Sequence, residues 1–190
     1  MKRTLLPLEL LVVLALLPAL QPPAHAAELA GVKLADSARV GDQTLILNGL
    51  GLRKKAIFKV YVAGLYVPAK SADANAILTA DAPRHLVMQF VRSVGAGSLT
   101  GGWDDCLKNN SPTAGSEVKK GFATLDGWMD DVKDEDQLAF TYEPGSGTAV
   151  TVKGQTKGTI EGKLFADALF ACWIGPEPPS EDFKSGLLGK

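Results

Sequence analysis

The sequence predicts an α+β fold, in which one antiparallel sheet carries helices gathered on one side. The first observation is the order of the predicted elements, because strands come first, helices follow, and a hairpin precedes a helical end. The second is the run at 57–67, which is apolar on both faces and therefore favours a strand central to a sheet. The third is the apolar period of three or four residues within 113–132, which is typical of a helix.

The first half of the chain predicts strands with one short helix among them. We expect two short strands within 32–48, followed by a turn at Gly49-Leu50-Gly51. The strand at 57–67 comes next, then a helix at 71–80 capped by Ser71. A strand over 84–92 and a Gly-rich turn over 93–98 complete this half.

The second half predicts helices around one hairpin. In chain order we expect helices at 99–109 and 113–132, a hairpin of 137–142 and 149–153, a strand at 155–160, a helix at 162–173 and a last helix capped by Ser180. One side of the helix at 162–173 is apolar and is expected to face the core: Leu164, Phe165, Ala168, Leu169, Cys172 and Trp173.

Residues 1–26 have the pattern of a secretory signal peptide. Lys2-Arg3 supplies the positive start, 10–20 the apolar stretch, and Ala24-His25-Ala26 the cleavage site. The apolar stretch is shorter than the roughly 20 residues that span a membrane, so no stable span is expected after cleavage. We therefore expect one domain over 27–190 in a periplasmic or secreted protein.

Charge and histidine content exclude several classes of function. The chain has 20 Lys and Arg and 21 Asp and Glu; removing the two basic and one acidic residues of the leader leaves 18 and 20, a net charge of −2. This balance offers no basic surface to a nucleic acid. His85 is then the one remaining histidine, so a His-rich zinc site is excluded and no metal or cofactor is expected. Since His85 begins an expected strand, we interpret it as a surface or packed residue.

Cys106 and Cys172 leave two alternatives open. Two cysteines in an exported chain favour a disulfide. Equally, each lies in an amphipathic helical pattern, where a buried thiol packs as a small hydrophobic group. A bridge requires Cα atoms about 4.4–6.8 Å apart, which the sequence does not fix.

Arg53 and Tyr61 are the candidate ligand-binding residues. Alternate side chains of a strand share a face, so Lys59 and Tyr61 lie together, and parity places Arg53 on the same side. A guanidinium and a phenol at an apolar cleft suit a long apolar molecule that ends in an anion. The alternative is an ordinary core strand with a structural tyrosine and a surface arginine.

Motifs near both ends of the chain carry a family resemblance. The motif in the first half consists of Gly49-Leu50-Gly51-Leu52-Arg53 and the segment 59–66. The motif near the C-terminus consists of the segment 158–169 and Trp173-Ile174-Gly175. With these motifs the chain resembles the chalcone isomerase family, and more narrowly its bacterial exported chalcone isomerase-like members, over essentially all of 32–189. The resemblance implies an open-faced β-sandwich, in which a long antiparallel sheet packs against a layer of helices and leaves an apolar cleft.

The resemblance also indicates what several positions do in the plant enzymes, which close a chalcone to a flavanone. Arg53 matches the arginine that binds the substrate oxyanion, whereas Tyr61 replaces a threonine. Cys172-Trp173 replaces a Thr-Met pair, and the catalytic tyrosine and an asparagine fall at Ser98 and Asp105. Ring closure relies on positioned hydrogen bonds, so these changes count against chalcone isomerase activity.

The pairing of Arg53 with Tyr61 resembles instead the fatty-acid-binding branch of the fold, where both residues hold the carboxylate. We therefore expect an exported, non-catalytic protein that binds a fatty acid or another small hydrophobic anion. Four further residues are expected to line the cleft: Cys172, Trp173, Phe90 and Met88.

Two other functions remain as alternatives. The first is an isomerase of the intramolecular lyase class, in which Arg53 stabilises an oxyanion and Asp104 or Asp105 acts as the general base. The second is a structural or interaction protein whose cleft is filled by the side chains of Trp173 and Tyr61.

Overall fold

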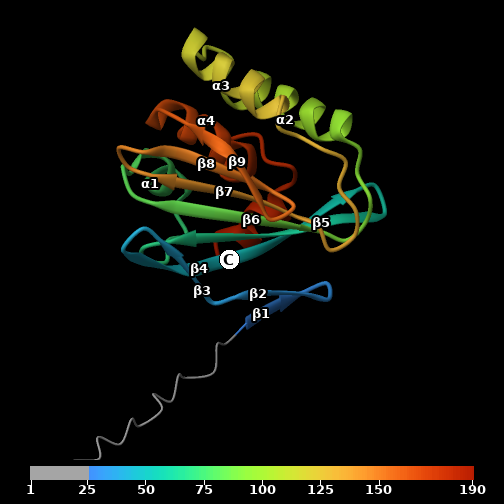
Figure 1. Ribbon diagram of the computed structural model, residues 1–190. Helices are drawn as coiled ribbons and strands as arrows, with labels where there is room; N and C mark the ends of the chain where they lie inside the picture. The colour runs from blue at the N-terminus through green and yellow to red at the C-terminus, as the bar shows by residue number, and fades with distance from the viewer. Residues whose placement is uncertain (1–25) are drawn as a thin grey trace, which may run out of the picture.

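Seven strands form one curled antiparallel sheet in which every strand lies beside its neighbours in the chain (Figure 1). The computed structural model describes residues 26–190, so the predicted leader lies outside the described residues except for Ala26. The strands of this sheet are β3 Ser37–Val40, β4 Gln43–Lys55, β5 Phe58–Val67, β6 Arg84–Phe90, β7 Gln137–Glu143, β8 Gly147–Val152 and β9 Gln155–Ile160.

The two faces of the sheet are covered differently. Helices α2 (Ala96–Asn110), α3 (Ser116–Asp126) and α4 (Lys163–Ile174) lie over one face (Figure 1). The hairpin of β1 (Ala26–Leu29) and β2 (Val32–Ala35) lies against the other. Two short helices complete the fold: α1 Ala74–Thr79 and α5 Glu181–Leu187. The predicted α+β class, with helices gathered on one side of an antiparallel sheet, is confirmed.

The core explains why β5 is apolar on both faces. Leu65 and Ala63 point into the main cluster beneath the helices, whereas Val62 packs with the β1–β2 hairpin and Tyr66 with β3 and β4. Burial of apolar surface on both sides is what a central strand requires. Ile57, which the sequence pattern places at the start of this strand, lies in the preceding turn and is 86% exposed.

A buried ion pair attaches α4 to the sheet. The Arg84 guanidinium at the start of β6 is 1% exposed and donates to the carboxylate of Asp167 on α4. Lys163 donates to the other carboxylate oxygen of Asp167 at 2.6 Å. Arg84 also donates to the backbone oxygens of Ile77 and Leu78, at 2.9 Å each, so the same side chain holds the end of α1.

The turn predicted at Gly49–Gly51 is wrong, because these residues lie inside β4. Their glycines serve close packing: a methyl group on Gly51 would lie 2.7 Å from the backbone oxygen of Phe183 in α5, and one on Gly49 would overlap the backbone of Gly186. The strand therefore needs glycine where α5 crosses it. These glycines allow close packing and do not form a turn.

Two helical predictions also need correction. The helix predicted at 71–80 begins at Ala74, because the carboxylate of Asp73, not Ser71, caps it by accepting the Ala76 N–H at 3.1 Å. The helix predicted at 113–132 runs only from Ser116 to Asp126. Its later apolar residues are still buried, but outside the helix, with Val132 bridged to Val94.

Leu164 does not face the core as predicted. It lies in the first turn of α4 and its side chain is 68% exposed, whereas the remaining apolar residues of that side are buried. No helix within residues 26–190 is both long and apolar enough to cross a membrane.

Candidate functional site

A cleft of about 670 Å³ lies between the helical face of the sheet, α2, the end of α4 and the segment that leads into α5. This volume falls within the usual range of small-molecule sites, about 300–1,000 Å³. Its lining residues used below come from four regions: Arg53, Lys55, Val60 and Tyr61 of the β4–β5 hairpin; Met88 and Phe90 of β6; Ser98, Trp103, Asp104, Asp105 and Cys106 of α2; and Cys172, Trp173, Glu177, Pro178 and Pro179 from α4 onward.

Arg53 brings a positive charge into this cleft from β4. It lies directly opposite Tyr61 of β5 in the strand register, which confirms that the two share the helical side. The guanidinium is half-buried and donates to the backbone oxygen of Pro179 at 2.8 Å. No carboxylate pairs with Arg53 among residues 26–190, and four of its five N–H groups are left for other acceptors.

A bulge in the strand pairing adds Val60 to the cleft. Arg53 pairs with Tyr61 but Lys54 pairs with Lys59, so Val60 is the extra residue. Strict alternation would turn Val60 to the opposite face, whereas it lines the cleft beside Tyr61. The sequence pattern gave no sign of this bulge.

Tyr61 places a hydroxyl at the floor of the cleft. Its ring packs edge-on against Phe90 at 5.6 Å and Phe183 at 5.8 Å, measured between ring centroids. Burial raises the pKa of Tyr61 to about 12, although a hydrogen bond from the Trp173 side chain and the charge of Arg53 act in the opposite direction. The phenol therefore keeps its proton at neutral pH and can donate it to an anion.

Cys172 and Trp173 bring the end of α4 to the cleft. Cys172 forms a disulfide with Cys106 of α2, with the two Cα atoms 5.2 Å apart, so the first of the two alternatives for these cysteines is the one observed. The bridge joins two helices that both line the cleft. Trp173 packs against Trp103 with ring centroids 5.6 Å apart.

Trp103 is a cleft residue that the sequence pattern did not single out. It lies three positions before Cys106 on α2 and is 6% exposed. Its indole N–H has no hydrogen-bond partner within the described part of the chain. A buried donor without an acceptor is unfavourable, so this indole carries a cost that no contact among the described residues offsets. The spacing from Cys106 was the available signal, because residues three apart share a helix face.

The structure brings together all six residues predicted to bind the ligand or form its wall. They are Arg53, Tyr61, Cys172, Trp173, Met88 and Phe90. The positions discussed for catalysis, Ser98, Asp104 and Asp105, also line the cleft, and the two aspartates are exposed. Trp173 is 1% exposed and Tyr61 9%, so both are packed into the core at the edge of the cleft, and a space of about 670 Å³ remains beside them.

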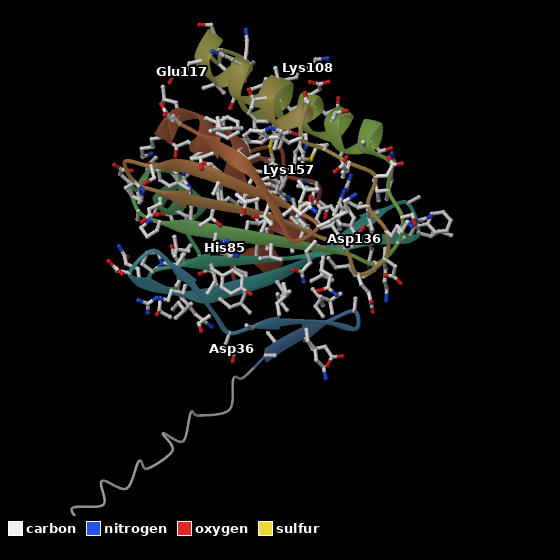
Figure 2. All side chains as sticks on the ribbon, viewed as in Figure 1. Asp36, His85, Lys108, Glu117, Asp136 and Lys157 are labelled. Carbon is white, nitrogen blue, oxygen red and sulfur yellow. A yellow bond between two sulfur atoms is a disulfide. The ribbon has the colours of Figure 1, made fainter. Side chains whose placement is uncertain are left out.

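His85 lies elsewhere. It is paired with Tyr66 in the sheet and lies on the side that faces away from the cleft (Figure 2). Its Nδ1 is 2.8 Å from the hydroxyl of Thr141, and burial lowers the pKa of His85 to about 4. A neutral imidazole on this face has no access to a ligand in the cleft.

The arrangement is suited to binding an anion with an apolar tail. Arg53 and Tyr61 supply a charge and a hydroxyl donor, and Phe90 and Met88, each about 1% exposed, lie beneath the floor of the cleft as part of the core. Charge-assisted hydrogen bonds from a guanidinium to a carboxylate are stronger than neutral ones. Within residues 26–190 no group of three His, Cys, Asp or Glu side chains is placed to hold a metal ion.

Comparison with known proteins supports this fold. Residues 26–189 match the model of a family described as chalcone isomerase-like. Among solved structures, the chain is similar to a fatty-acid binding protein from Arabidopsis thaliana, with a TM-score of 0.68 and 19% identity, over 86% of this chain and 96% of that chain. At this low sequence identity, the similarity shows a shared fold and nothing more. No curated protein matches the sequence.

Proposed function

The chain belongs to the chalcone isomerase-like family, and we propose that it is a non-catalytic binding protein for a fatty acid or a similar small hydrophobic anion. One observation carries the proposal: Arg53, a half-buried guanidinium with no acidic partner among the described residues, lies opposite the Tyr61 hydroxyl in an open cleft. A buried or half-buried charge without a partner is costly, and a ligand carboxylate removes that cost.

The apolar part of the cleft lining supplies the rest of the binding free energy. Each methylene that moves from water to an apolar surface contributes about 0.8 kcal/mol. An acyl chain lying along the partly exposed apolar lining residues Val60, Pro178 and Pro179 therefore gains affinity with length until the cleft is full. The fatty-acid binding protein of similar fold supports this class of ligand, although its low identity shows only that the fold can house one.

We further propose that the protein acts outside the cytoplasm. The leader-like pattern of residues 1–26 and the Cys106–Cys172 disulfide both support export, because disulfides persist in oxidising compartments. Cell fractionation tests this directly: the protein is expected in the periplasm or medium without its leader. An intact leader on a cytoplasmic protein would contradict export while leaving the ligand proposal untouched.

Thermal unfolding with fatty acids of increasing chain length tests the ligand class. At a hundredfold excess over Kd, a ligand stabilises the folded state by about 2.7 kcal/mol. Each kcal/mol raises Tm by about 2–4 °C in a chain of this size. We expect a shift that grows with chain length and disappears in Arg53→Ala.

The matched control is Arg39→Ala, which removes an exposed arginine of β3 that lies outside the cleft. It should keep the full shift. No shift of the wild-type protein with any chain length would reject the proposed ligand class.

One observation keeps isomerase activity as a second candidate: Asp104 and Asp105 line the same cleft as Arg53. A carboxylate there could accept a proton while the guanidinium stabilises the resulting oxyanion. Loss of the visible absorbance of a chalcone measures this reaction. A wild-type rate equal to that of Arg53→Ala would exclude it.

A further inference from the structure

The turn between β4 and β5 lies at one end of the sheet (Figure 1). It exposes two adjacent apolar side chains. Ile57 is 86% exposed and Phe58 is 54% exposed. The other large apolar side chains exposed among residues 26–190, Ile46 and Leu164, occur singly. Adjacent exposed apolar residues at a projecting turn are unfavourable in water unless they contact something.

Positive charges surround these two side chains. Four exposed cationic residues lie on the hairpin or beside it: Lys54, Lys55, Lys59 and Arg92. None of them forms an ion pair within residues 26–190. The Arg92 guanidinium lies 4.7 Å from the centre of the Phe58 ring, which ties this charge to the apolar tip.

Three of the five acidic residues in the segment 130–136, near this end of the sheet, have partners, whereas the exposed side chains of Asp134 and Glu135 have none among the described residues. The segment 130–136 leads into β7 and lies beside the end of β6, where the Glu135 N–H donates to the Phe90 oxygen. Within it, Asp130 pairs with Lys153 and Lys157, and Asp131 and Asp136 accept backbone N–H groups. The turn itself carries no acidic residue between Leu52 and Val67, so its own charge is entirely positive.

The tip lies at the mouth of the cleft. Lys55 and Val60, which flank the exposed turn on β4 and β5, both line the cleft. The turn is a tight one, with Ala56 held at a φ of 53°, so Ile57 and Phe58 are presented by a short hairpin end and not by a long loop. A surface that contacts the tip therefore lies beside the opening through which a ligand enters.

We propose that this tip, formed by Ile57 and Phe58 with Lys54, Lys59 and Arg92, docks the protein onto the surface of an anionic lipid bilayer. The two apolar side chains enter the boundary between headgroups and acyl chains, and the cations contact anionic headgroups. Docking places the cleft mouth against the bilayer, where hydrophobic anions are held. The inference does not depend on ligand binding, because the tip residues Ile57 and Phe58 are outside the cleft lining.

Sedimentation with vesicles tests the docking without any added ligand. Wild-type protein should bind vesicles of phosphatidylglycerol and phosphatidylcholine, and bind pure phosphatidylcholine vesicles much more weakly. Ile57→Ser/Phe58→Ser should bind anionic vesicles at least about tenfold more weakly, because two apolar side chains that leave water on docking are lost. Leu164→Ser, which removes an exposed leucine on α4, is the matched control and should bind as wild type.

A second pair of variants tests the charges. Lys54→Gln/Lys59→Gln should weaken binding to anionic vesicles and flatten its salt dependence, whereas Lys119→Gln/Lys120→Gln on α3 should not. Circular dichroism confirms that each variant is folded. Absence of wild-type vesicle binding, or equal binding by Ile57→Ser/Phe58→Ser, would overturn the proposal. Concentration-dependent dimers of wild type that this variant abolishes, with no vesicle binding, would assign the tip to self-association instead.

Discussion

Arg53 is important at the scale of single residues because its charge meets no acidic partner among the described residues. Its contact with the Pro179 oxygen orients the guanidinium but does not neutralise it. Tyr61 beside it keeps its proton, since burial raises its pKa to about 12. Together the two side chains can donate hydrogen bonds to an anion, and neither can act as a general base at neutral pH.

His85 gives a pH dependence at the same scale, on the opposite face of the sheet. Burial lowers the pKa of His85 from 6.5 to about 4. Between these two values the unfolded chain binds a proton that the folded protein does not, so stability present above about pH 6.5 is lost as the pH falls toward 4. One pKa unit corresponds to about 1.4 kcal/mol, so the loss should be roughly 1–3 kcal/mol.

Urea unfolding of wild type and His85→Gln at pH 7.5 and pH 4.5 measures this effect. The wild-type protein should lose more stability than the variant on acidification. Equal losses would show that His85 does not titrate differently in the two states. Because other groups titrate in both proteins, only the difference between them is informative.

At the scale of elements, the glycines of β4 show what the sequence could and could not predict. The motif predicts the position of Arg53, but its glycines also predict a turn, whereas Gly49 and Gly51 lie within a strand. Glycine marks both turns and sites of close backbone approach, and only the position of α5 distinguishes them. The Val60 bulge and the early end of α3 also depend on tertiary contacts that local patterns do not contain.

Gly51→Ala tests the close packing of α5 on β4. The added methyl group would lie 2.7 Å from the Phe183 backbone oxygen and 2.9 Å from its ring, so the helix must move. We expect a loss of about 1–3 kcal/mol in the free energy of unfolding, as in other overpacked sites. Gly97→Ala on α2, where no atom lies within 4 Å of the added group, is the control and should be neutral or slightly stabilising. A loss equal to that of the control would contradict close packing.

At the scale of the molecule, the sheet, helix layer and cleft follow from the segregation of strands and helices along the chain. That segregation, with the alternation in β5, is sufficient to predict the fold class and the face of the sheet that carries the cleft. The exposure of Leu164 and the choice between a disulfide and two thiols were not predictable, because both depend on how α2 and α4 meet.

The Cys106–Cys172 disulfide should contribute to the stability of the whole fold. It closes a loop with a sequence separation of 66 residues, and the loss of unfolded-state entropy for such a loop corresponds to about 4 kcal/mol. The free energy of unfolding of Cys106→Ser/Cys172→Ser should therefore be roughly 2–4 kcal/mol lower than that of the wild type. The variant should unfold at a lower urea concentration. A reducing agent should destabilise the wild type and leave the variant unchanged. Insensitivity of the wild type to reduction would contradict the bridge.

The central claim is that Arg53 and Tyr61 hold the anionic end of an apolar ligand. Calorimetric titration of the delipidated protein with a saturated fatty acid and with its methyl ester tests it most directly, because the two share a tail and differ in charge. We expect the acid to bind at least about tenfold more tightly than the ester, since hydrogen bonds to charged groups contribute about 1.5–3 kcal/mol. Arg53→Ala should remove the difference and Tyr61→Phe should reduce it. Equal affinity of the wild-type protein for acid and ester would contradict the claim.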